Sequence, residues 1–319
     1  MYFSKFKFYH GLMFHHFHDS DKHKKFQGSI SKNDFIKIIK FVGRKNILDA
    51  DEFINRLSEN KLRKEVCITF DDGLMSQFDV ALPILQDLNI KAFFFPHTAI
   101  FGNKPDYLEI YRYFRVNFFK NINEFYKSFF KNTKLDINKI FTTNDLKNEI
   151  LRIKSKAPFY SLNDIKFRIL RNNIISSKQY HLIMMHMFSE KNFKPSSVKN
   201  LLFLKKKNII KLCKMGHLIG LHSHNHPYRI ANLTIKKQKL EYLKNIREIS
   251  KISNFKSTLY KSIAHPSGSY DKRIFNFLRK KEIKIGFRHI MNADGGKVNL
   301  SKYEVARQDH ANIIKMIKK

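Results

Sequence analysis

Residues 66–73 read Val-Cys-Ile-Thr-Phe-Asp-Asp-Gly, an apolar run of strand length that ends in two carboxylates and a turn glycine. A helical spacing of apolar residues follows between Val80 and Leu88, and residues 90–95 form a second apolar run closed by Pro96. A strand, a helix and a second strand joined by short connections predict a parallel sheet with right-handed crossovers.

The same alternation continues on both sides of this unit. Before it, residues 6–15 form an aromatic-rich strand, Ser31 and Asp34 make a capping box for a helix, and residues 51–57 form a short helix. After it, the sequence predicts helices over 205–215, from Thr234 onward and over 272–281, and strands over 217–221, 261–264, 283–287 and 303–306. Strand–helix units of this size predict an α/β barrel of fewer than eight regular units.

Residues 103–202 differ from the rest of the chain. They are dense in Phe, Tyr, Lys and Asn, lack strand-and-turn punctuation and show a mainly helical pattern. We therefore interpret residues 1–319 as a single barrel that carries a large helical insertion over residues 103–202.

The composition excludes some classes of protein. Of the 319 residues, 43% are hydrophobic, which is enough for a full core and excludes wholesale disorder. The 61 Lys and Arg against 27 Asp and Glu give a formal net charge of +34, and the lysines are spread along the whole chain. This spread argues against a nucleic-acid partner, which would favour a concentrated basic motif, and is compatible with contact with an anionic membrane surface.

The compartment is predicted from what the sequence lacks. The first residues have neither the apolar core nor the cleavage site that a signal peptide requires. No uncharged apolar run approaches the ~18 residues that a membrane span needs. The two cysteines, Cys67 and Cys213, cannot make a disulfide framework and are expected to be small buried hydrophobes. We expect a cytoplasmic protein, or one that is peripheral at the inner membrane face.

The carboxylates Asp71 and Asp72 form one half of the predicted site. In isolation they could simply cap the following helix, but two close carboxylates are costly unless a cation or proton lies between them. The other half is His222 and His226, four residues apart and directly after another apolar strand. Two imidazoles and a carboxylate at one barrel mouth make a three-ligand metal site with an open position for water.

These motifs identify a family resemblance. Thr-Phe-Asp-Asp-Gly at 69–73 followed by His-Ser-x-x-His at 222–226 resembles the polysaccharide deacetylases with the NodB homology domain, carbohydrate esterase family 4. The resemblance covers most of the chain outside the insertion and implies a distorted (β/α)7 barrel that hydrolyses N-acetyl groups of amino sugars. It implies that Asp71 is the general base, and that Asp72, His222 and His226 hold a divalent metal, most often zinc.

The third motif of the family departs from its usual form. Residues 264–271 read Ala-His-Pro-Ser-Gly-Ser-Tyr-Asp, without the arginine that orients the base in many members. Arg307, in an Arg-x-Asp that ends at Asp309, is predicted to supply that charge. The resemblance further places His265, Pro266, Gly268 and Asp309 among the residues that bind substrate.

The general acid has two candidates. The Leu-x-His motif that supplies it near the C-terminus of many members is absent, and the nearest residue there is His310. Residues 12–15, Leu-Met-Phe-His, are instead similar to the opening strand of the circularly permuted poly-N-acetylglucosamine deacetylases. We therefore predict that a protonated His15 donates to the departing amine, with His310 as the rival.

The resulting hypothesis is a metal-dependent carbohydrate N-deacetylase that acts on a cell-surface glycan or its precursor. An N-deformylase of a lipid- or nucleotide-linked formamido sugar is a close variant, because the same site can hydrolyse an N-formyl group. A basic, non-catalytic binding protein on the same barrel is the alternative from another class. The complete set of Asp71, Asp72, His222 and His226 favours catalysis. The sequence does not identify the sugar, the acyl group, the metal or the oligomeric state.

Overall fold

The computed structural model describes residues 2–102, 107–156, 160–252, 259–289 and 301–318. The chain divides into two compact units, the first made of residues 1–106 and 199–319 and the second of residues 107–198. The predicted site residues all belong to the first unit, which we refer to as the barrel unit.

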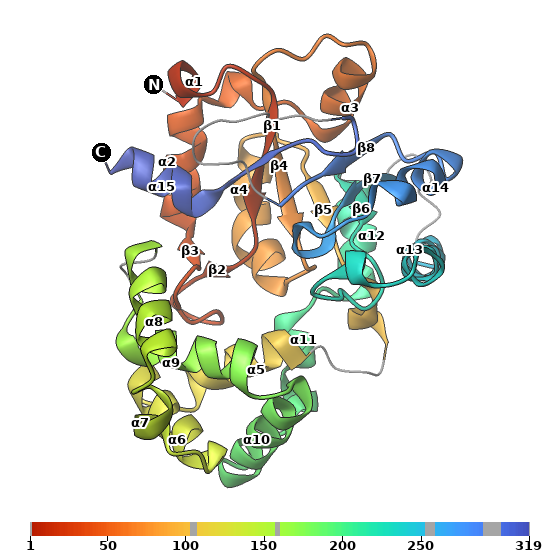
Figure 1. Cartoon of the computed structure of the whole chain (residues 1–319). Helices are drawn as coiled ribbons and strands as arrows, with labels where there is room; N and C mark the ends of the chain where they lie inside the picture. The colour runs from red at the N-terminus through yellow and green to blue at the C-terminus, as the bar shows by residue number, and fades with distance from the viewer. Residues whose placement is uncertain (1, 103–106, 157–159, 253–258, 290–300, 319) are drawn as a thin grey trace. The chain divides into compact units, whose positions relative to one another are not determined.

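A parallel seven-stranded sheet forms the centre of the barrel unit over the described residues (Figure 1). Its strands run in the order β8 (Ile285–Phe287), β7 (Leu259–Ala264), β6 (Leu218–Leu221), β5 (Phe93–Phe95), β4 (Val66–Asp71), β1 (His10–Phe14) and β9 (Arg307–Asp309). A further parallel bridge joins Phe287, at the end of β8, to Val305, just before β9, so the sheet curves round on itself. This nearly closed sheet confirms the predicted α/β barrel with its large helical region.

The alternation of side chains along β4 explains how the barrel is filled. Val66, Ile68 and Phe70 point outward into the core shared with the helices, whereas Cys67 packs among the apolar residues inside the barrel. Because strand side chains alternate, Thr69 and Asp71 lie on the same inner side as Cys67. The strand therefore delivers Asp71 to the inside of the barrel at its carboxyl end.

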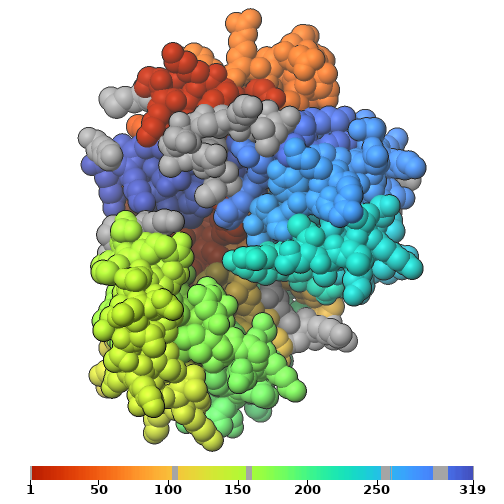
Figure 2. Space-filling model, in the orientation of Figure 1, coloured from red at the N-terminus to blue at the C-terminus, as the bar shows by residue number. Residues whose placement is uncertain are grey.

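Helices cover the outside of the sheet. They are α1 (Tyr2–Lys5), α2 (Lys32–Val42), α3 (Ala50–Ser58), α4 (Leu82–Asp87), α12 (Lys206–Lys214), α13 (Ile235–Ser250), α14 (Phe275–Lys280) and α15 (His310–Ile317). The predicted capping box is present, since the Ser31 side chain accepts from the Asp34 N–H and the Asp34 carboxylate accepts from the Ser31 N–H. Figures 1 and 2 show α13 and the segment leading into α14 side by side on one outer face of the unit.

Two predicted elements differ in detail from the structure. In the helix that begins after Thr234, Leu240 falls at the apolar helical spacing but is 55% exposed, and α13 buries Gln238, Tyr242, Asn245 and Ile249. Gln238 and Asn245 are buried because they hydrogen bond to loops. The last strand was expected over 303–306, but Tyr303 and its neighbours form a turn against β8, and β9 begins only at Arg307.

The second unit, described by itself, is helical. It contains α5 (Tyr107–Asn117), α6 (Ile122–Thr133), α7 (Ile137–Ile140), α8 (Asn144–Lys156), α9 (Leu162–Ile169) and α10 (Ser177–Glu190). Its core is aromatic: the rings of Phe114 and Phe188 lie 4.6 Å apart, and those of Phe129 and Phe167 lie 4.9 Å apart. The high Phe and Tyr content of the insertion is thus used largely for packing.

Two smaller expectations can also be compared with the structure. Cys67 and Cys213 are both reduced and both buried, as predicted. Among the described residues, none of the helices combines the length and the apolar character that crossing a membrane requires.

Candidate active site

The register of the parallel strands brings the predicted catalytic residues to one end of the barrel. Phe14 on β1 pairs with Phe70 on β4, so the next residues along the two strands, His15 and Asp71, emerge side by side. His222 follows β6, a further strand of the same sheet. The carboxyl ends of parallel strands meet at one face, which is where barrels carry their active sites.

Arg307 and Asp71 form a buried ion pair inside this mouth. The guanidinium donates from Nη1 to Asp71 Oδ1 at 2.6 Å and from Nη2 to Oδ2 at 2.7 Å, and both side chains are at most 2% exposed. Burial alone would raise the pKa of Asp71, but the charge of Arg307, helped by His222, lowers it to about 2. Asp71 is therefore an oriented carboxylate that stays ionised at neutral pH.

A glycine on the neighbouring strand makes room for this arginine. Gly11 on β1 pairs with Arg307 on β9, and a Cβ at Gly11 would lie 3.0 Å from the Arg307 Cγ. The third guanidinium nitrogen, Nε, donates to the Arg288 carbonyl at 2.6 Å. Arg307 thus links Asp71 to the end of β8, across the closure of the barrel.

Asp72, His222 and His226 converge on one point. Their ligand atoms lie within 4.8 Å of one another, with Asp72 Oδ1 at 3.3 Å from His222 Nε2 and 3.5 Å from His226 Nε2. Donor atoms around a tetrahedral ion with bonds of about 2.0–2.2 Å are separated by roughly 3.3–3.5 Å. Both distances to Asp72 match this separation, so the three side chains fit a divalent metal ion, and a tetrahedral ion held by them would have a fourth position for water.

The protonation states of the three residues also suit a metal. His222 donates from Nδ1 to the Ala264 carbonyl at 2.8 Å, which leaves the Nε2 lone pair directed at Asp72. Burial tends to raise the pKa of Asp72, but His222 and His226 hold it well below its usual range. The carboxylate is thus ionised, and the hydrogen bond at Nδ1 orients the Nε2 atom of His222 toward Asp72.

The loop after β6 is held by α13. Asn245 accepts from the His222 N–H at 3.0 Å, and Glu241 accepts from the backbone N–H groups of His224 and Asn225. Within the loop, Ser223 and His226 have φ values of 62° and 50°. These values lie in the left-handed region, which residues other than glycine rarely adopt. Such backbone strain persists only where the surroundings impose it, and here α13 supplies those contacts.

His15 and His310 occupy different environments. His15 Nε2 lies 3.8 Å from Asp71 Oδ2 at the mouth, and desolvation lowers the pKa of His15 to about 4 against the opposing effect of Asp72 and Asp71. Its carbonyl, like that of Asp71, accepts from the buried amide of Gln77. His310 is 6% exposed and stacks on Phe14, whose side chain lies in the core between the sheet and the helices. The structure therefore brings His15, and not His310, to Asp71.

The residues predicted to bind substrate make packing and capping contacts with the fold in this structure. His265 is fully buried, where its Nε2 hydrogen bonds to the Tyr303 carbonyl and its ring stacks on Tyr270. Pro266 is also buried. Asp309 caps α15 by accepting from the Ala311 N–H, and Gly268 lies beside His289. Their contact with substrate stays a prediction.

The sequence pattern does not single out three polar residues of this region, Gln77, Asn245 and His289. Gln77 and Asn245 were not singled out because a polar residue in a helical pattern predicts a solvent-facing position. His289 lies in no motif, and its only signal was its place after the strand predicted over 283–287.

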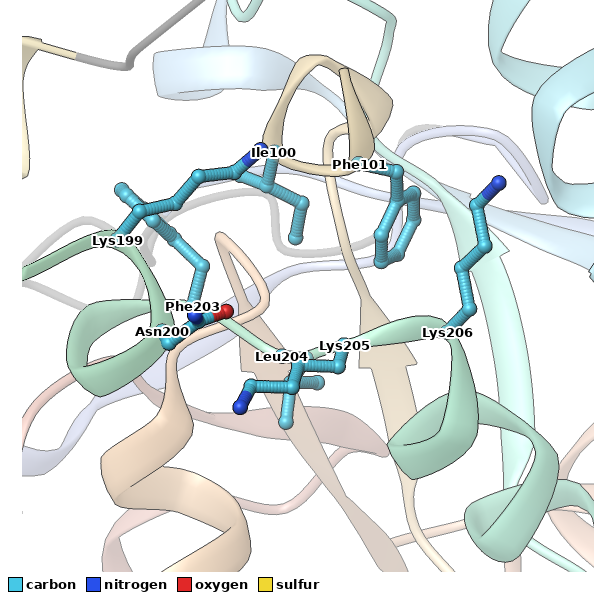
Figure 3. Close-up of a pocket in the computed structure, with 8 residues that line it drawn as sticks. All are labelled: Ile100, Phe101, Lys199, Asn200, Phe203, Leu204, Lys205 and Lys206. Atoms are coloured by element: carbon cyan, nitrogen blue, oxygen red, sulfur yellow. The ribbon is translucent and has the colours of Figure 1, made fainter. Parts of the chain in front are cut away.

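A pocket of about 190 Å³ adjoins the loop that carries Asp72 (Figure 3). Its apolar wall includes Ile100 and Phe203, which pack on Leu74, and the Leu204 N–H donates to the Gly73 carbonyl. Its remaining lining residues include three lysines and no acidic side chain: Lys199, Lys205 and Lys206. We call residues 72–74 the metal loop, and its neighbourhood is thus basic on this side.

Comparison with known proteins places the chain in a family. The model of the polysaccharide deacetylases matches residues 58–113 and 178–286, more than half of the 319 residues. The barrel and its Asp-His-His group define this class of protein, and the chain therefore belongs to the polysaccharide deacetylase family. The family resemblance predicted from the sequence is confirmed. A search among curated proteins finds no match.

Solved structures show the same fold at low sequence identity. The deacetylase PplD of Streptococcus pyogenes, in complex with acetate, is 14% identical with a TM-score of 0.53, over 98% of this chain and 99% of that one. A de-N-acetylase from Aggregatibacter actinomycetemcomitans is 14% identical with a TM-score of 0.52, over 97% and 99%. IcaB from Ammonifex degensii is 12% identical with a TM-score of 0.54, over 98% and 96%.

Proposed function

We propose that this protein is a metal-dependent hydrolase that removes the N-acetyl group from an amino sugar of a cell-surface glycan or its precursor. One observation carries the proposal: the ionised Asp71, oriented by Arg307, stands at the same mouth as the Asp72, His222 and His226 group. A mixed nitrogen and oxygen ligand set supports zinc as the ion. Membership of the family supports an N-acylated carbohydrate as the substrate.

The reaction follows from the groups present. A bound divalent cation would polarise the acyl carbonyl and lower the pKa of water at the site. Asp71 accepts the proton of the water that attacks the carbonyl carbon. His15 donates a proton to the nitrogen as the C–N bond breaks, because an amide anion is too poor a leaving group. One C–O bond forms, one C–N bond breaks, and acetate and the amino sugar leave.

The resting state of His15 differs from the sequence-based expectation of a protonated acid. With a pKa of about 4 the imidazole is neutral at pH 7, because the mouth desolvates it. The proton therefore reaches His15 during the reaction. Asp71, whose pKa is about 2 and whose Oδ2 lies 3.8 Å away, holds a proton less well than His15 and passes it on.

We further propose a nucleotide-linked or lipid-linked precursor as the substrate, at the cytoplasmic face of the membrane. The basic pocket beside the metal loop and the net charge of +34 support a phosphate-bearing substrate or an anionic surface.

The test is an assay of purified, zinc-loaded protein with a panel of nucleotide-linked and lipid-linked N-acetyl and N-formyl sugars, in which acetate and formate are measured. We expect acetate release by the wild type. The Asp71→Asn variant should keep its metal and lose roughly 10²-fold or more in rate, because only the proton acceptor is removed. The His222→Ala variant should lose both metal and activity.

Other results of this assay would change the assigned function or the assigned base. Preferential release of formate would make the protein a deformylase. Full metal occupancy without release of either acid from any sugar would reject catalysis and favour the basic binding protein. An Asp71→Asn variant with a near-normal rate would show that the base is another residue.

A further inference from the structure

His289 lies at the mouth of the barrel, directly after β8, and has no part in the reaction described above. Its side chain is exposed, and its ring centroid is 6.5 Å from that of His15, with the two rings inclined at 67°. No hydrogen bond joins its side chain to any residue that the structure describes. Its two ring nitrogens are therefore available to a ligand beside the proposed general acid.

The backbone that leads to His289 is fixed relative to the base. The Arg288 N–H donates to the Val305 carbonyl at 2.8 Å, and the Arg288 carbonyl accepts from Arg307 Nε at 2.6 Å. The same guanidinium binds both oxygens of Asp71. The peptide group that joins Arg288 to His289 is thus tied, through Arg307, to Asp71.

Gly268 provides the space that His289 occupies. A Cβ on Gly268 would lie 2.3 Å from the His289 Cβ, far inside van der Waals contact, and the φ of Gly268 is +68°. A residue with a side chain would both strain this turn and push His289 away. This close approach gives a physical reason for the glycine of the sequence His-Pro-Ser-Gly.

Packing at the mouth favours the neutral form of the His289 imidazole, although part of the side chain is exposed. Desolvation by the crowded mouth lowers its pKa and Arg307 lowers it further, whereas Asp71, Asp309 and Asp72 oppose this change. A neutral imidazole offers one N–H donor and one acceptor nitrogen. Such a ring can hydrogen bond with a hydroxyl group in either direction.

We propose that His289 binds the sugar through a hydroxyl group close to the carbon that bears the N-acyl group, and that Gly268 holds the space His289 needs. The inference rests on the proposed deacetylase function and specifies which side of the mouth receives the sugar. His15 meets the leaving nitrogen, so a neighbour of His15 faces the sugar and not the acyl group. His289 is then a substrate-binding residue, and Gly268 a positioning residue.

Two probes separate this role from a structural one: a chitooligosaccharide, which carries the sugar, and 4-nitrophenyl acetate, which carries an acyl group without it. We expect His289→Ala to lower kcat/KM for the oligosaccharide by about 10-fold, the loss of one hydrogen bond of about 1.4 kcal/mol, and to leave hydrolysis of 4-nitrophenyl acetate unchanged. His289→Asn, which keeps a donor and an acceptor, should recover most of the loss. His186→Ala, at an exposed histidine of α10, is the matched control and should change neither rate.

Gly268→Ala tests the positioning role. It should reproduce the selective loss, and the Gly268→Ala/His289→Ala double variant should lose no more than His289→Ala alone on the oligosaccharide, since both remove one contact. Equal losses on both probes, or no loss on the oligosaccharide, would overturn the proposal. A wild-type protein that cleaves 4-nitrophenyl acetate but no N-acetyl sugar would instead reject the proposed function.

Discussion

Arg307 connects the chemistry of the site to the stability of the fold. Its guanidinium is completely buried and all three of its nitrogens have acceptors, two of them on Asp71. A buried pair is costly to break, because the partner that remains is a charge without compensation. The residue that orients Asp71, the proposed base, is therefore also one that the folded barrel requires.

Arg307→Ala should destabilise the protein by about 3–5 kcal/mol and abolish deacetylation, because Asp71 is left buried without its counter-ion. Urea unfolding followed by circular dichroism measures the first effect. Arg273→Ala is the control, since it breaks an exposed pair with Asp271 and should leave the unfolding midpoint unchanged. An Arg307→Ala variant as stable as the Arg273→Ala variant would contradict the role given to this pair.

The low pKa of Asp71 makes a prediction for acid pH. The carboxyl has a pKa of about 2 in the folded protein and an ordinary value of 3.8, so the folded state favours its ionised form. This stabilisation is present above pH ~4 and is lost as the pH falls from about 4 to about 2. The difference in unfolding free energy between wild type and Asp71→Asn should therefore shrink over that range. A constant difference from pH 5 to pH 2.5 would mean that Asp71 titrates normally.

Helix α13 shows how an element far from the reacting atoms shapes the site. Its Asn245 accepts from the His222 N–H and also donates to Thr98, so it joins the loop after β6 to the segment after β5. The outer side of the same helix carries Leu240, which is exposed. The two residues make a natural pair of test and control positions.

Asn245→Ala should weaken metal binding by about 10–100-fold, the usual effect of removing a group that orients a ligand. Competition with a chromogenic chelator measures this affinity. Leu240→Ala should bind the metal as the wild type does, since its side chain contacts solvent. Equal affinities for the two variants would show that the loop holds His222 without help from α13.

The sequence predicted those parts of the site that depend on short-range pattern. The strand ending in Asp71 and Asp72 and the strand before His222 were recognisable because apolar runs define strands and polar residues after them mark the mouth. Asn245 and Gln77 were not, because their burial depends on loops that reach them from distant parts of the chain. Leu240 illustrates the same point: it falls at an apolar helical spacing and is nevertheless exposed, because periodicity alone does not say which side of a helix tertiary contacts cover.

The closure of the barrel depends on Gly286, as the fit of Arg307 depends on Gly11. Gly286 in β8 lies against the turn at Tyr303, and a Cβ there would come within 2.6 Å of the Tyr303 carbonyl oxygen. The Gly286 N–H also donates to the Lys302 carbonyl, and its carbonyl accepts from Val305. This is where the two ends of the sheet meet.

Gly286→Ala should therefore destabilise the barrel unit by about 1–3 kcal/mol or more, because the added methyl meets backbone that cannot rotate away. Thermal unfolding measures the effect as a lower Tm. Gly102→Ala is the control, since its Cβ would meet only one atom, at 3.4 Å. If the two variants have equal Tm values, the β8 closure tolerates a side chain and contributes little to stability.

The pairing of Gly11 with Arg307 also has a consequence for biosynthesis. Ribosomes add about 5–20 residues per second, so on the order of 15–60 s separates the appearance of these two strand partners. Until then β1 has one edge without its final neighbour and Asp71 has no counter-ion. Pairing over such distances slows folding. A nascent chain of this protein should consequently depend on chaperones that shield the open edge of β1 until the segment with Arg307 has been synthesised.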